Sequence, residues 1–409
     1  MPGFFAGKTV VLGVTGSIAA YKACELASRL VEQGARVLTA LTPAALEFVQ
    51  PATFEAITRQ RAITGLFDPV PQPEIEHIAV AKQADLFLVA PATANILAKA
   101  AVGLADDWLS TTLLATRAPI LFAPAMNTMM YEHPATQANI ETLRGRGCHF
   151  VGPDAGALAC GDTGLGRLAA IPNILEAAAI LLHTEKDLAG RHVLITSGAN
   201  HEPIDPVRFI GNRSSGKMGR AIALEALSRG ARVTVVAGIS EVPLPRAVEL
   251  VRAETAKAMF EAVQTRWPQA DIFIGAAAVA DYHVAHPTPE KHKRGEANLE
   301  LALVPNPDIA AWVGTHKRPD QISVCFAAET QTPIENAIAK RTEKNADLVV
   351  VNQVGGTECA FGAETTSAAI LNATATSGEL QRLTKESLAT EILNKISALL
   401  QTSIAPPQQ

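Results

Sequence analysis

Cysteine is scarce in this sequence, and its few copies are scattered. The 409 residues contain five cysteines, at positions 24, 148, 160, 325 and 359, and no two of them form a C-x-x-C pair. An odd number of isolated cysteines indicates neither a disulfide framework nor a zinc site. Any cysteine chemistry would therefore depend on a single thiol.

Long apolar runs and a strong excess of one charge are also absent. No stretch reaches the roughly 18 consecutive apolar residues of a membrane-spanning helix, and the segment MPGFFAGK lacks the pattern of a signal peptide. The formal net charge is −5, with 48% hydrophobic and 18% charged residues, which gives no basic footprint for nucleic acid. We therefore expect a soluble, cytoplasmic, globular protein that binds neither nucleic acid nor membranes.

The chain contains a weak internal repeat. Residues 7–41 read as strand, glycine turn, helix and strand, and the same order returns within residues 190–238. In both copies apolar residues follow the turn at helical spacing, and a glycine ends the helix. Further strands are expected in DLFLVAP, PILFAPA, DIFIGAAAV, ISVCFAAET and DLVVVNQ. Short strands that alternate with helices predict an α/β fold with two Rossmann-like parallel-sheet domains.

The expected domain boundary is the polar stretch HTEKDLAG, which follows an apolar helix and precedes a new strand. We place the first domain at 1–187 and the second at 188–409. The tail 401–409, rich in proline and glutamine, is expected to be disordered.

The first glycine turn, in GVTGSIAAYK, is expected to bind one phosphate group. Gly13, Gly16 and Ser17 stand where a strand turns into a helix, whose N-terminus presents unpaired N–H groups to an anion. A dinucleotide site would need G-x-G-x-x-G and an acidic residue after the second strand, but that strand ends at Thr42. The pattern favours a mononucleotide, with a purely structural turn as the alternative.

Two later strand ends carry polar residues at what should be the same rim of the sheet. The segments PATAN and PAMN supply Thr93, Asn95 and Asn127, although each of these could also be an ordinary helix cap. Further on, ACGDTGLGR places Cys160 before three closely spaced glycines. Such a segment is hard to hold as a regular element and is expected to be a mobile flap, with Cys160 either functional or an incidental thiol.

In the second half, GNRSSGKM nearly matches a nucleotide-binding P-loop. Met218 stands where a hydroxyl should hold magnesium, and the run before the glycine is only VRFI, after the proline-rich EPIDP. We therefore reject a P-loop NTPase. The segment still precedes a helix and offers hydroxyl and N–H groups to an anion. The residues concerned are Ser214, Ser215 and Gly216, with Lys217 and Arg208 nearby in sequence.

The first half resembles the flavin-dependent cysteine decarboxylases, through GVTGSIAAYK, EHIAVAKQAD, PATANILAKAAVGLADD, PAMN and ACGDTGLGR. The resemblance is to the decarboxylase half of the bifunctional phosphopantothenoylcysteine decarboxylase and phosphopantothenate–cysteine ligase of bacterial coenzyme A biosynthesis. It implies an active-site base at His77, carboxylate recognition by Asn127 and a proton donor at Cys160, while the flavin supplies the redox chemistry. The implied FMN contacts are Gly16, Ser17, Thr42, Thr93 and Asn95.

The second half resembles the ligase partner, through DPVRFIGNRSSGKMG, AAAVADY, PEKHK, NPDI, CFAAET and AKRTEKNADLVVVN. The resemblance implies that CTP activates a carboxylate as an acyl-cytidylate, which cysteine then attacks, with Asn212 as a catalytic residue and Asp281 as the contact for Mg²⁺. Departures from the family pattern at 199–201, Gly211, Arg213 and Cys325 leave the choice of CTP over ATP open. The implied substrate- and nucleotide-binding residues are Arg208, Ser214, Ser215, Gly216, Ala277, Asp281, Lys291, Asn306, Pro307, Asp308, Ile309, Phe326, Lys340 and Lys344.

Taken together, these resemblances imply an enzyme that joins 4′-phosphopantothenate to cysteine and decarboxylates the product to 4′-phosphopantetheine. They also imply a homo-oligomer built on trimers, a dodecamer, with ligase halves paired as dimers and active sites shared between subunits. Two alternatives are weighed. A flavin-binding regulatory protein of the halotolerance type is disfavoured by the complete second half, and a generic flavin or nicotinamide oxidoreductase by the absence of the acidic residue after the second strand.

Overall fold

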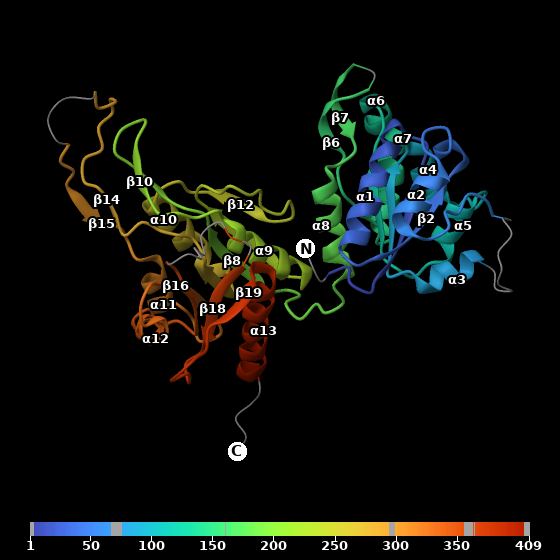
Figure 1. Cartoon of the computed structure of the whole chain (residues 1–409). Helices are drawn as coiled ribbons and strands as arrows, with labels where there is room; N and C mark the ends of the chain where they lie inside the picture. The colour runs from blue at the N-terminus through green and yellow to red at the C-terminus, as the bar shows by residue number, and fades with distance from the viewer. Residues whose placement is uncertain are drawn as a thin grey trace. The chain divides into compact units, whose positions relative to one another are not determined.

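The structure, a computed structural model, describes residues 4–66, 76–159, 161–293, 299–355, 363 and 365–404. The chain forms two compact units, Met1–Thr184 and Glu185–Gln409 (Figure 1). Each unit has its own sheet and its own core, and each is considered by itself below.

A five-stranded parallel sheet forms the centre of the first unit, with the strand order β2-β1-β3-β4-β5. Its strands are β1 (Thr9–Val14), β2 (Arg36–Leu41), β3 (Leu86–Ala92), β4 (Ile120–Pro124) and β5 (His149–Phe150). The strands are apolar along nearly their whole length because helices cover both faces of the sheet. In this doubly wound order successive strands are added first on one side of β1 and then, from β3 onwards, on the other, and such a switch point is where open α/β sheets bind ligands.

The helices of the first unit lie in two layers. One layer, with α1, α2 and α8, packs against one face of the sheet, and α4, α5 and α7 pack against the other. A two-stranded antiparallel hairpin, β6–β7, precedes α8. The bounds are α1 (Tyr21–Glu32), α2 (Pro51–Thr58), α3 (Glu76–Gln83), α4 (Ala94–Val102), α5 (Trp108–Ala115), α6 (Thr128–Glu132), α7 (Pro134–Gly145), α8 (Ile171–Leu182), β6 (Asp154–Ala157) and β7 (Thr163–Arg167), with short 3₁₀ turns η1 (Ile18–Ala20) and η2 (Pro43–Ala45).

The second unit contains an eight-stranded sheet in the order β12-β11-β8-β13-β16-β17-β18-β19. The strands from β12 to β17 are parallel, whereas β18 and β19 run antiparallel to their neighbours. The bounds are β8 (His192–Ser197), β11 (Arg232–Ala237), β12 (Glu249–Arg252), β13 (Ile272–Gly275), β16 (Ile322–Glu329), β17 (Leu348–Gln353), β18 (Thr365–Leu371) and β19 (Gln381–Thr384).

Helices also cover both faces of this second sheet. The core on one face comes from α9 and α13, and the core on the other from α10, α11 and α12. Two small hairpins, β9–β10 and β14–β15, complete the unit. The bounds are α9 (Lys217–Ser228), α10 (Ala256–Arg266), η3 (Trp267–Gln269), α11 (Ile309–Thr315), α12 (Pro333–Glu343), α13 (Lys385–Ile404), β9 (His201–Pro203), β10 (Phe209–Gly211), β14 (Tyr282–Val284) and β15 (Leu303–Pro305).

The predicted α/β fold is confirmed, and all five apolar runs expected as strands contain one. Two expectations need correction. The second sheet is mixed, because β18 and β19 add an antiparallel edge to the parallel strands. Residues 401–404, expected to belong to a disordered tail, are part of α13, which continues to Ile404, and residues 405–409 lie outside the described part of the chain.

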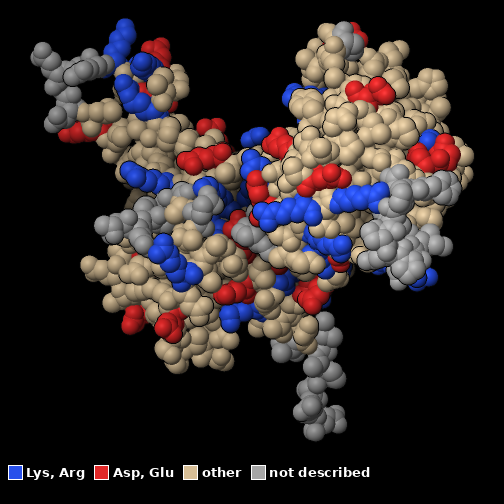
Figure 2. All heavy atoms as spheres, turned by 45° about the vertical axis from the view of Figure 1, so that its right-hand side comes forward, with Lys and Arg blue, Asp and Glu red and all other residues tan. Residues whose placement is uncertain are grey.

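The surface of each unit mixes both charges. Lys and Arg side chains lie among Asp and Glu side chains on the face shown in Figure 2. Among the helices that the structure describes, none combines the length and the apolar character needed to cross a bilayer.

Candidate active sites

The first unit contains a cavity of about 650 Å³ at the carboxyl ends of β1, β3 and β4. The hairpin β6–β7 forms another of its walls. The cavity thus lies at the switch point of the sheet, where a ligand is expected from the topology. Its lining residues are Gly16, Ser17, Ile18, Ala19, Tyr21, Lys22, Thr93, Ala125, Met126, Asn127, Met130, Ala157, Leu158, Ala159, Gly166, Arg167 and Leu168.

The turn after β1 is held by close backbone packing. Ser17 caps η1, and its Oγ accepts a hydrogen bond of 3.3 Å from the N–H of Ala19. A Cβ on Gly16 would lie 2.5 Å from the Cβ of Ala44, so any larger residue would push the turn away from the segment after β2. The tight turn thus places the start of the helical segment η1 at the wall of the cavity.

Thr15 connects the ends of β1 and β3. Its Oγ1 donates to the carbonyl oxygen of Pro91 at 2.7 Å and accepts from the N–H of Thr93 at 3.2 Å. Thr93 in turn caps α4, and Asn127 caps α6 by accepting from the N–H of Met129 at 2.8 Å. Both predicted site residues therefore also serve as helix caps.

Four residues predicted from the first half line this cavity, namely Gly16, Ser17, Thr93 and Asn127. The other predicted residues of this half do not line it within the described part of the chain. Thr42 follows β2, where its Oγ1 is buried without a hydrogen-bond partner among the described residues. Asn95 is exposed in the first turn of α4, His77 is half-buried in the first turn of α3, and Cys160 lies outside the described residues.

The segment TGLGR is not an irregular flap, as expected from its glycines, but the strand β7. Its glycines allow it to pass closely over the turn before α6. A Cβ on Gly164 would lie 2.5 Å from Oγ1 of Thr128, and one on Gly166 would overlap the carbonyl oxygen of Met126. The N–H of Met126 also donates to the carbonyl oxygen of Gly166 at 2.9 Å. The expectation of an irregular segment was wrong because these glycines serve tight packing, and the mobility of the segment stays a prediction.

In the second unit, two adjacent cavities lie at the carboxyl ends of the parallel strands. We call them the Asn212 cavity, of about 450 Å³, and the Asp308 cavity, of about 400 Å³. The two cavities share a junction, so one extended ligand could occupy both. The residues that line both are Ala277, Val279, Asp281, Phe326 and Lys340.

The Asn212 cavity lies at the N-terminus of α9. Gly216 precedes the helix with a φ of 75°, and a Cβ there would overlap Ser240. A Cβ on Gly219 would overlap Ser197 at the end of β8, so the first turn of α9 lies directly at the end of that strand. Asn212 donates from Nδ2 to the carbonyl oxygen of Val279 at 2.8 Å.

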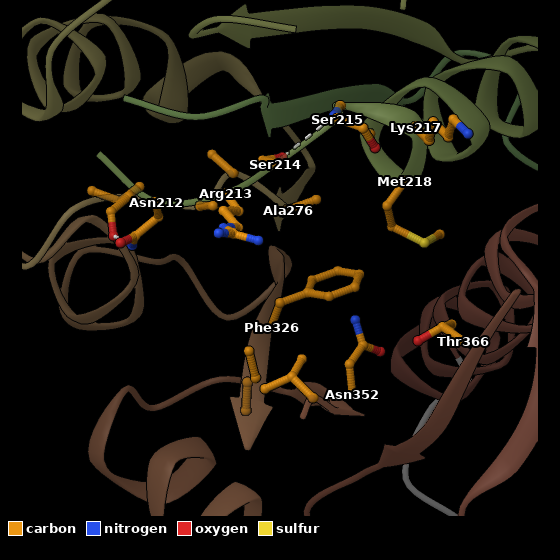
Figure 3. A pocket seen from close by; sticks show the side chains of 18 of the residues that line it. Asn212, Arg213, Ser214, Ser215, Lys217, Met218, Ala276, Phe326, Asn352 and Thr366 are labelled. Atoms are coloured by element: carbon orange, nitrogen blue, oxygen red, sulfur yellow. Dashed lines mark hydrogen bonds between the residues drawn. The ribbon is translucent and has the colours of Figure 1, made fainter. Parts of the chain in front are cut away.

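Figure 3 shows how the walls of the Asn212 cavity are composed. Asn212 and Arg213 lie on one side of the Phe326 ring, and Asn352 and Thr366 lie on the other. The charged side chains that line the cavity are four cations and one carboxylate, which favours an anionic ligand. They are Arg213, Lys217, Lys340, Lys385 and Asp281.

The Asp308 cavity contains an ordered ion pair. Lys344 Nζ lies 2.8 Å from Oδ2 of Asp308, whose Oδ1 caps α11 by accepting from the N–H of Ala311 at 2.8 Å. Burial alone would lower the pKa of Lys344, but its hydrogen bonds to Asp308 and Glu343 raise it. Burial alone would raise the pKa of Asp308, but the hydrogen bonds from Lys344 and Ala311 lower it. Both side chains therefore stay charged.

Cys325 also lines the Asp308 cavity, on β16. Burial raises the pKa of its thiol to about 11, so the thiol stays neutral and is a poor nucleophile at neutral pH.

Most residues predicted for the second half line these two cavities. They are Asn212, Ser214, Ser215, Gly216, Ala277, Asp281, Asn306, Pro307, Asp308, Ile309, Phe326, Lys340 and Lys344. Arg208 and Lys291 do not. The Arg208 guanidinium instead lies 2.6 Å from Oδ2 of Asp205 and donates to the carbonyl oxygen of His292 at 3.0 Å. Lys291 is exposed on the same segment as His292.

The carboxylate of Asp205, in the turn of the hairpin β9–β10, connects that hairpin to the segment that contains His292. Burial alone would raise the pKa of Asp205, but the hydrogen bonds from the N–H groups of Val207, Arg208 and His292, and from the Arg208 guanidinium, lower it to about 2. The carboxylate thus stays ionised in the folded state at pH values where an unfolded aspartate is already protonated.

We expect Asp205→Asn to lower the melting temperature at neutral pH, with a difference that shrinks as the pH falls from about 4 towards 2. The folded-state pKa is lower than the ordinary value of 3.8, so this carboxylate contributes stability above that value and loses it at lower pH. Melting curves across this range measure the effect, with the exposed Glu290→Gln as control. A difference in melting temperature that does not change with pH would contradict the lowered pKa of Asp205.

Comparisons with known proteins agree across both units. Residues 5–183 match the family model "Flavoprotein", and residues 188–400 match "DNA/pantothenate metabolism flavoprotein C-terminal domain". The coenzyme A biosynthesis bifunctional protein CoaBC of Escherichia coli K12 is 46% identical over 352 residues, which cover 85% of this chain and 87% of the relative. That of Bacillus subtilis 168 is 42% identical over 395 residues, which cover 96% and 97%. The chain belongs to the CoaBC family.

Two solved structures are similar to parts of this CoaBC family member. The C-terminal domain of a coenzyme A biosynthesis bifunctional protein CoaBC is 35% identical, with a TM-score of 0.44, and the match covers 53% of this chain and all of that one. The FMN-dependent cysteine decarboxylase SpaF is 32% identical, with a TM-score of 0.38, and the match covers 44% of this chain and 97% of that one.

Membership of the CoaBC family confirms the resemblance read from the sequence. The chain is a bifunctional enzyme of coenzyme A biosynthesis with the expected decarboxylase and ligase activities, and its first half is a flavoprotein.

Several cavity residues of this CoaBC chain were not among those predicted. In the first unit Lys22 and Arg167 are the charged residues that line the cavity, and both belong to segments already singled out. Arg213 and Lys217 likewise lie within GNRSSGKM. Three further polar residues of the Asn212 cavity are Asn352, Thr366 and Lys385. Asn352 ends the motif AKRTEKNADLVVVN, whereas no motif indicated the other two.

Proposed function

We propose that the first unit decarboxylates 4′-phosphopantothenoylcysteine with FMN, and that the second unit makes this compound from 4′-phosphopantothenate and cysteine with CTP. The observation that carries the proposal is the position of the first cavity. It lies at the β1/β3 switch point and contains a single glycine turn suited to one phosphate group. No acidic residue ends β2, which favours a mononucleotide over a dinucleotide.

The residues of the first cavity fit a bound FMN. Gly16 and Ser17 would hold its phosphate at the start of η1, with Thr93 at the neighbouring strand end. The buried, unpartnered hydroxyl of Thr42 supports a further polar contact with the cofactor. When bound, FMN supplies the electron sink for loss of carbon dioxide. Asn127 would orient the substrate carboxylate by hydrogen bonding.

His77 would act as the base and Cys160 as the proton donor. Neither His77 nor Asn95 lines the cavity of a single chain. We therefore infer that residues of a neighbouring subunit complete each decarboxylase site in a trimer-based oligomer; the dodecamer with dimeric ligase halves is what the family resemblance implies. Arg208 and Lys291, the predicted ligase residues that line neither cavity, would likewise contact ligands bound by a neighbouring subunit.

In the second unit the nucleoside would occupy the Asp308 cavity, where Asn306 and the ordered ion pair provide polar contacts. Lys340 lines both cavities and would neutralise charge on the phosphate that is attacked. Asp281 also lines both cavities and offers a hard oxygen ligand for Mg²⁺. Phosphate oxygens and water would complete the coordination, since Mg²⁺ is usually held by one or two carboxylates together with substrate phosphates.

We expect the purified protein to bind about one FMN per chain and to be yellow, because the first cavity offers one phosphate site. Absorbance spectra after removal and readdition of FMN measure this, with NAD⁺ as the control ligand. Mass spectrometry of a mixture with phosphopantothenate, cysteine, CTP and Mg²⁺ should then detect 4′-phosphopantetheine. A protein that takes up no FMN, or that forms no ligation product, would overturn the corresponding half of the proposal.

A further inference from the structure

We propose that Thr366 binds a phosphate group in the Asn212 cavity, namely the terminal phosphates that leave the nucleotide as pyrophosphate. This inference rests on the proposed ligase function. It concerns a wall of the cavity built from β17 and β18, and no motif of the sequence indicated β18 or Thr366.

The evidence begins with the hydroxyl group of Thr366. The residue lines the cavity, is only 5% exposed, and its Oγ1 has no hydrogen-bond partner in the described part of the chain. A buried hydroxyl without a partner is unfavourable and therefore rare in folded proteins. Figure 3 shows this hydroxyl directed towards the space around the Phe326 ring. A ligand in the cavity would supply the missing partner.

A second polar side chain lies on the same wall. Asn352 of β17 pairs in register with Ala368 of β18, and residues two apart on a strand share a face, so Asn352 and Thr366 face the same way. The Nδ2 of Asn352 points into the cavity in Figure 3 and can donate to an anion, whereas its Oδ1, buried without a partner among the described residues, can only accept. The wall therefore combines a hydroxyl donor with an amide donor.

The opposite wall is also suited to an anion. The twelve-residue helix α9 begins at the cavity, so its unpaired N–H groups and the positive end of its dipole lie there. The Oγ of Ser214 accepts from the N–H of Gly216 at 3.3 Å, which holds the turn before the helix in place. Cations outnumber carboxylates among the lining residues. A phosphate between the two walls would receive hydrogen bonds from both.

The order of the two cavities favours the nucleotide as the source of this phosphate. With the nucleoside in the Asp308 cavity, the α-phosphate would lie at the junction near Asp281 and Lys340. The β- and γ-phosphates would then extend into the Asn212 cavity. When a carboxylate oxygen of phosphopantothenate bonds to the α-phosphorus, the bond to the β-phosphate oxygen breaks, and pyrophosphate leaves with that electron pair. Thr366 would donate a hydrogen bond to the departing group.

The test compares Thr366→Val, which removes the hydroxyl at nearly constant shape, with Thr366→Ser, which keeps it. We expect Thr366→Val to weaken binding of inorganic pyrophosphate, measured by calorimetry, by roughly tenfold, since hydrogen bonds to charged groups are the strong ones. KM for CTP should rise similarly, while KM for phosphopantothenate stays within about twofold. Thr366→Ser should restore most of the binding. Thr365→Val, a change at the neighbouring residue of β18, is the matched control.

Stability provides a second readout that a purely structural hydroxyl would not give. Because the group is unpartnered, Thr366→Val should leave the melting temperature of the ligand-free protein unchanged or raise it. A lower melting temperature with unchanged pyrophosphate affinity would overturn the proposal in favour of a structural role. A rise in KM for phosphopantothenate alone would assign the subsite to its 4′-phosphate and overturn the nucleotide assignment. Failure of the wild-type protein to ligate would instead refute the proposed function.

Discussion

Replacing Asn212 with aspartate should lower the ligase rate by roughly 100-fold or more, because one preorganised donor near developing charge typically contributes that much. Asn212 Nδ2 donates to the carbonyl oxygen of Val279 at 2.8 Å, which fixes the side chain at the mouth of its cavity. Aspartate has no donor there, and its carboxylate would face both that carbonyl oxygen and the phosphates of the nucleotide. Decarboxylation should be unaffected, because its cavity is in the other unit.

Pyrophosphate release and carbon dioxide release, measured on the same preparation, separate the two activities. The decarboxylase assay uses supplied 4′-phosphopantothenoylcysteine, so that it does not depend on ligation. Asn372→Asp is the matched control, since Asn372 is exposed in a turn of the same unit, where its Oδ1 accepts from Thr374 Oγ1 at 3.1 Å. Unchanged ligation in Asn212→Asp, or equal loss of both activities, would refute the division of labour.

Much of each candidate site could be predicted because parallel sheets gather the ends of distant strands at one edge. Gly16, Thr93 and Asn127 follow three different strands, and the structure brings them to one cavity. Both faces of the sheet are buried, so its strands are continuous apolar runs. Such runs are easy to recognise in the local sequence. The same reasoning explains why Asp281, which follows β13, and Phe326, which lies within β16, converge at the junction of two cavities.

The features that sequence reasoning missed depend on contacts between distant segments. The strand β18 reads TTSAAIL, with hydroxyl residues and alanines before its two large apolar residues, so its antiparallel pairing with β17, and with it the position of Thr366, had no strong local signal. Arg208 was expected at a ligand because of its motif, but in a single chain it pairs with Asp205. The strand β7 was expected to be irregular, but its glycines serve packing against another segment, which composition alone does not show.

That packing predicts the second large effect. Gly166→Ala should lower decarboxylation by roughly 100-fold or more, since misplacing a catalytic group by about 1 Å can cost that much. The new Cβ would overlap the carbonyl oxygen of Met126, and the φ of +148° at this position is one that residues other than glycine rarely adopt. The strand β7 would have to shift away from the turn that carries Asn127, and the cavity wall would shift with it.

Single-turnover carbon dioxide release measures the loss, while flavin absorbance and a melting curve report whether the first unit still folds and binds its cofactor. Gly145→Ala is the matched control, because a Cβ at Gly145, at the end of α7, meets no other atom within 4 Å. Ligation should be normal in both variants, since its cavities lie in the other unit. If Gly166→Ala keeps normal decarboxylation, the contact between β7 and the Met126 turn does not position the substrate site. If it loses flavin and melts at a lower temperature, the contact supports the whole unit, and the specific loss of rate predicted here would be wrong.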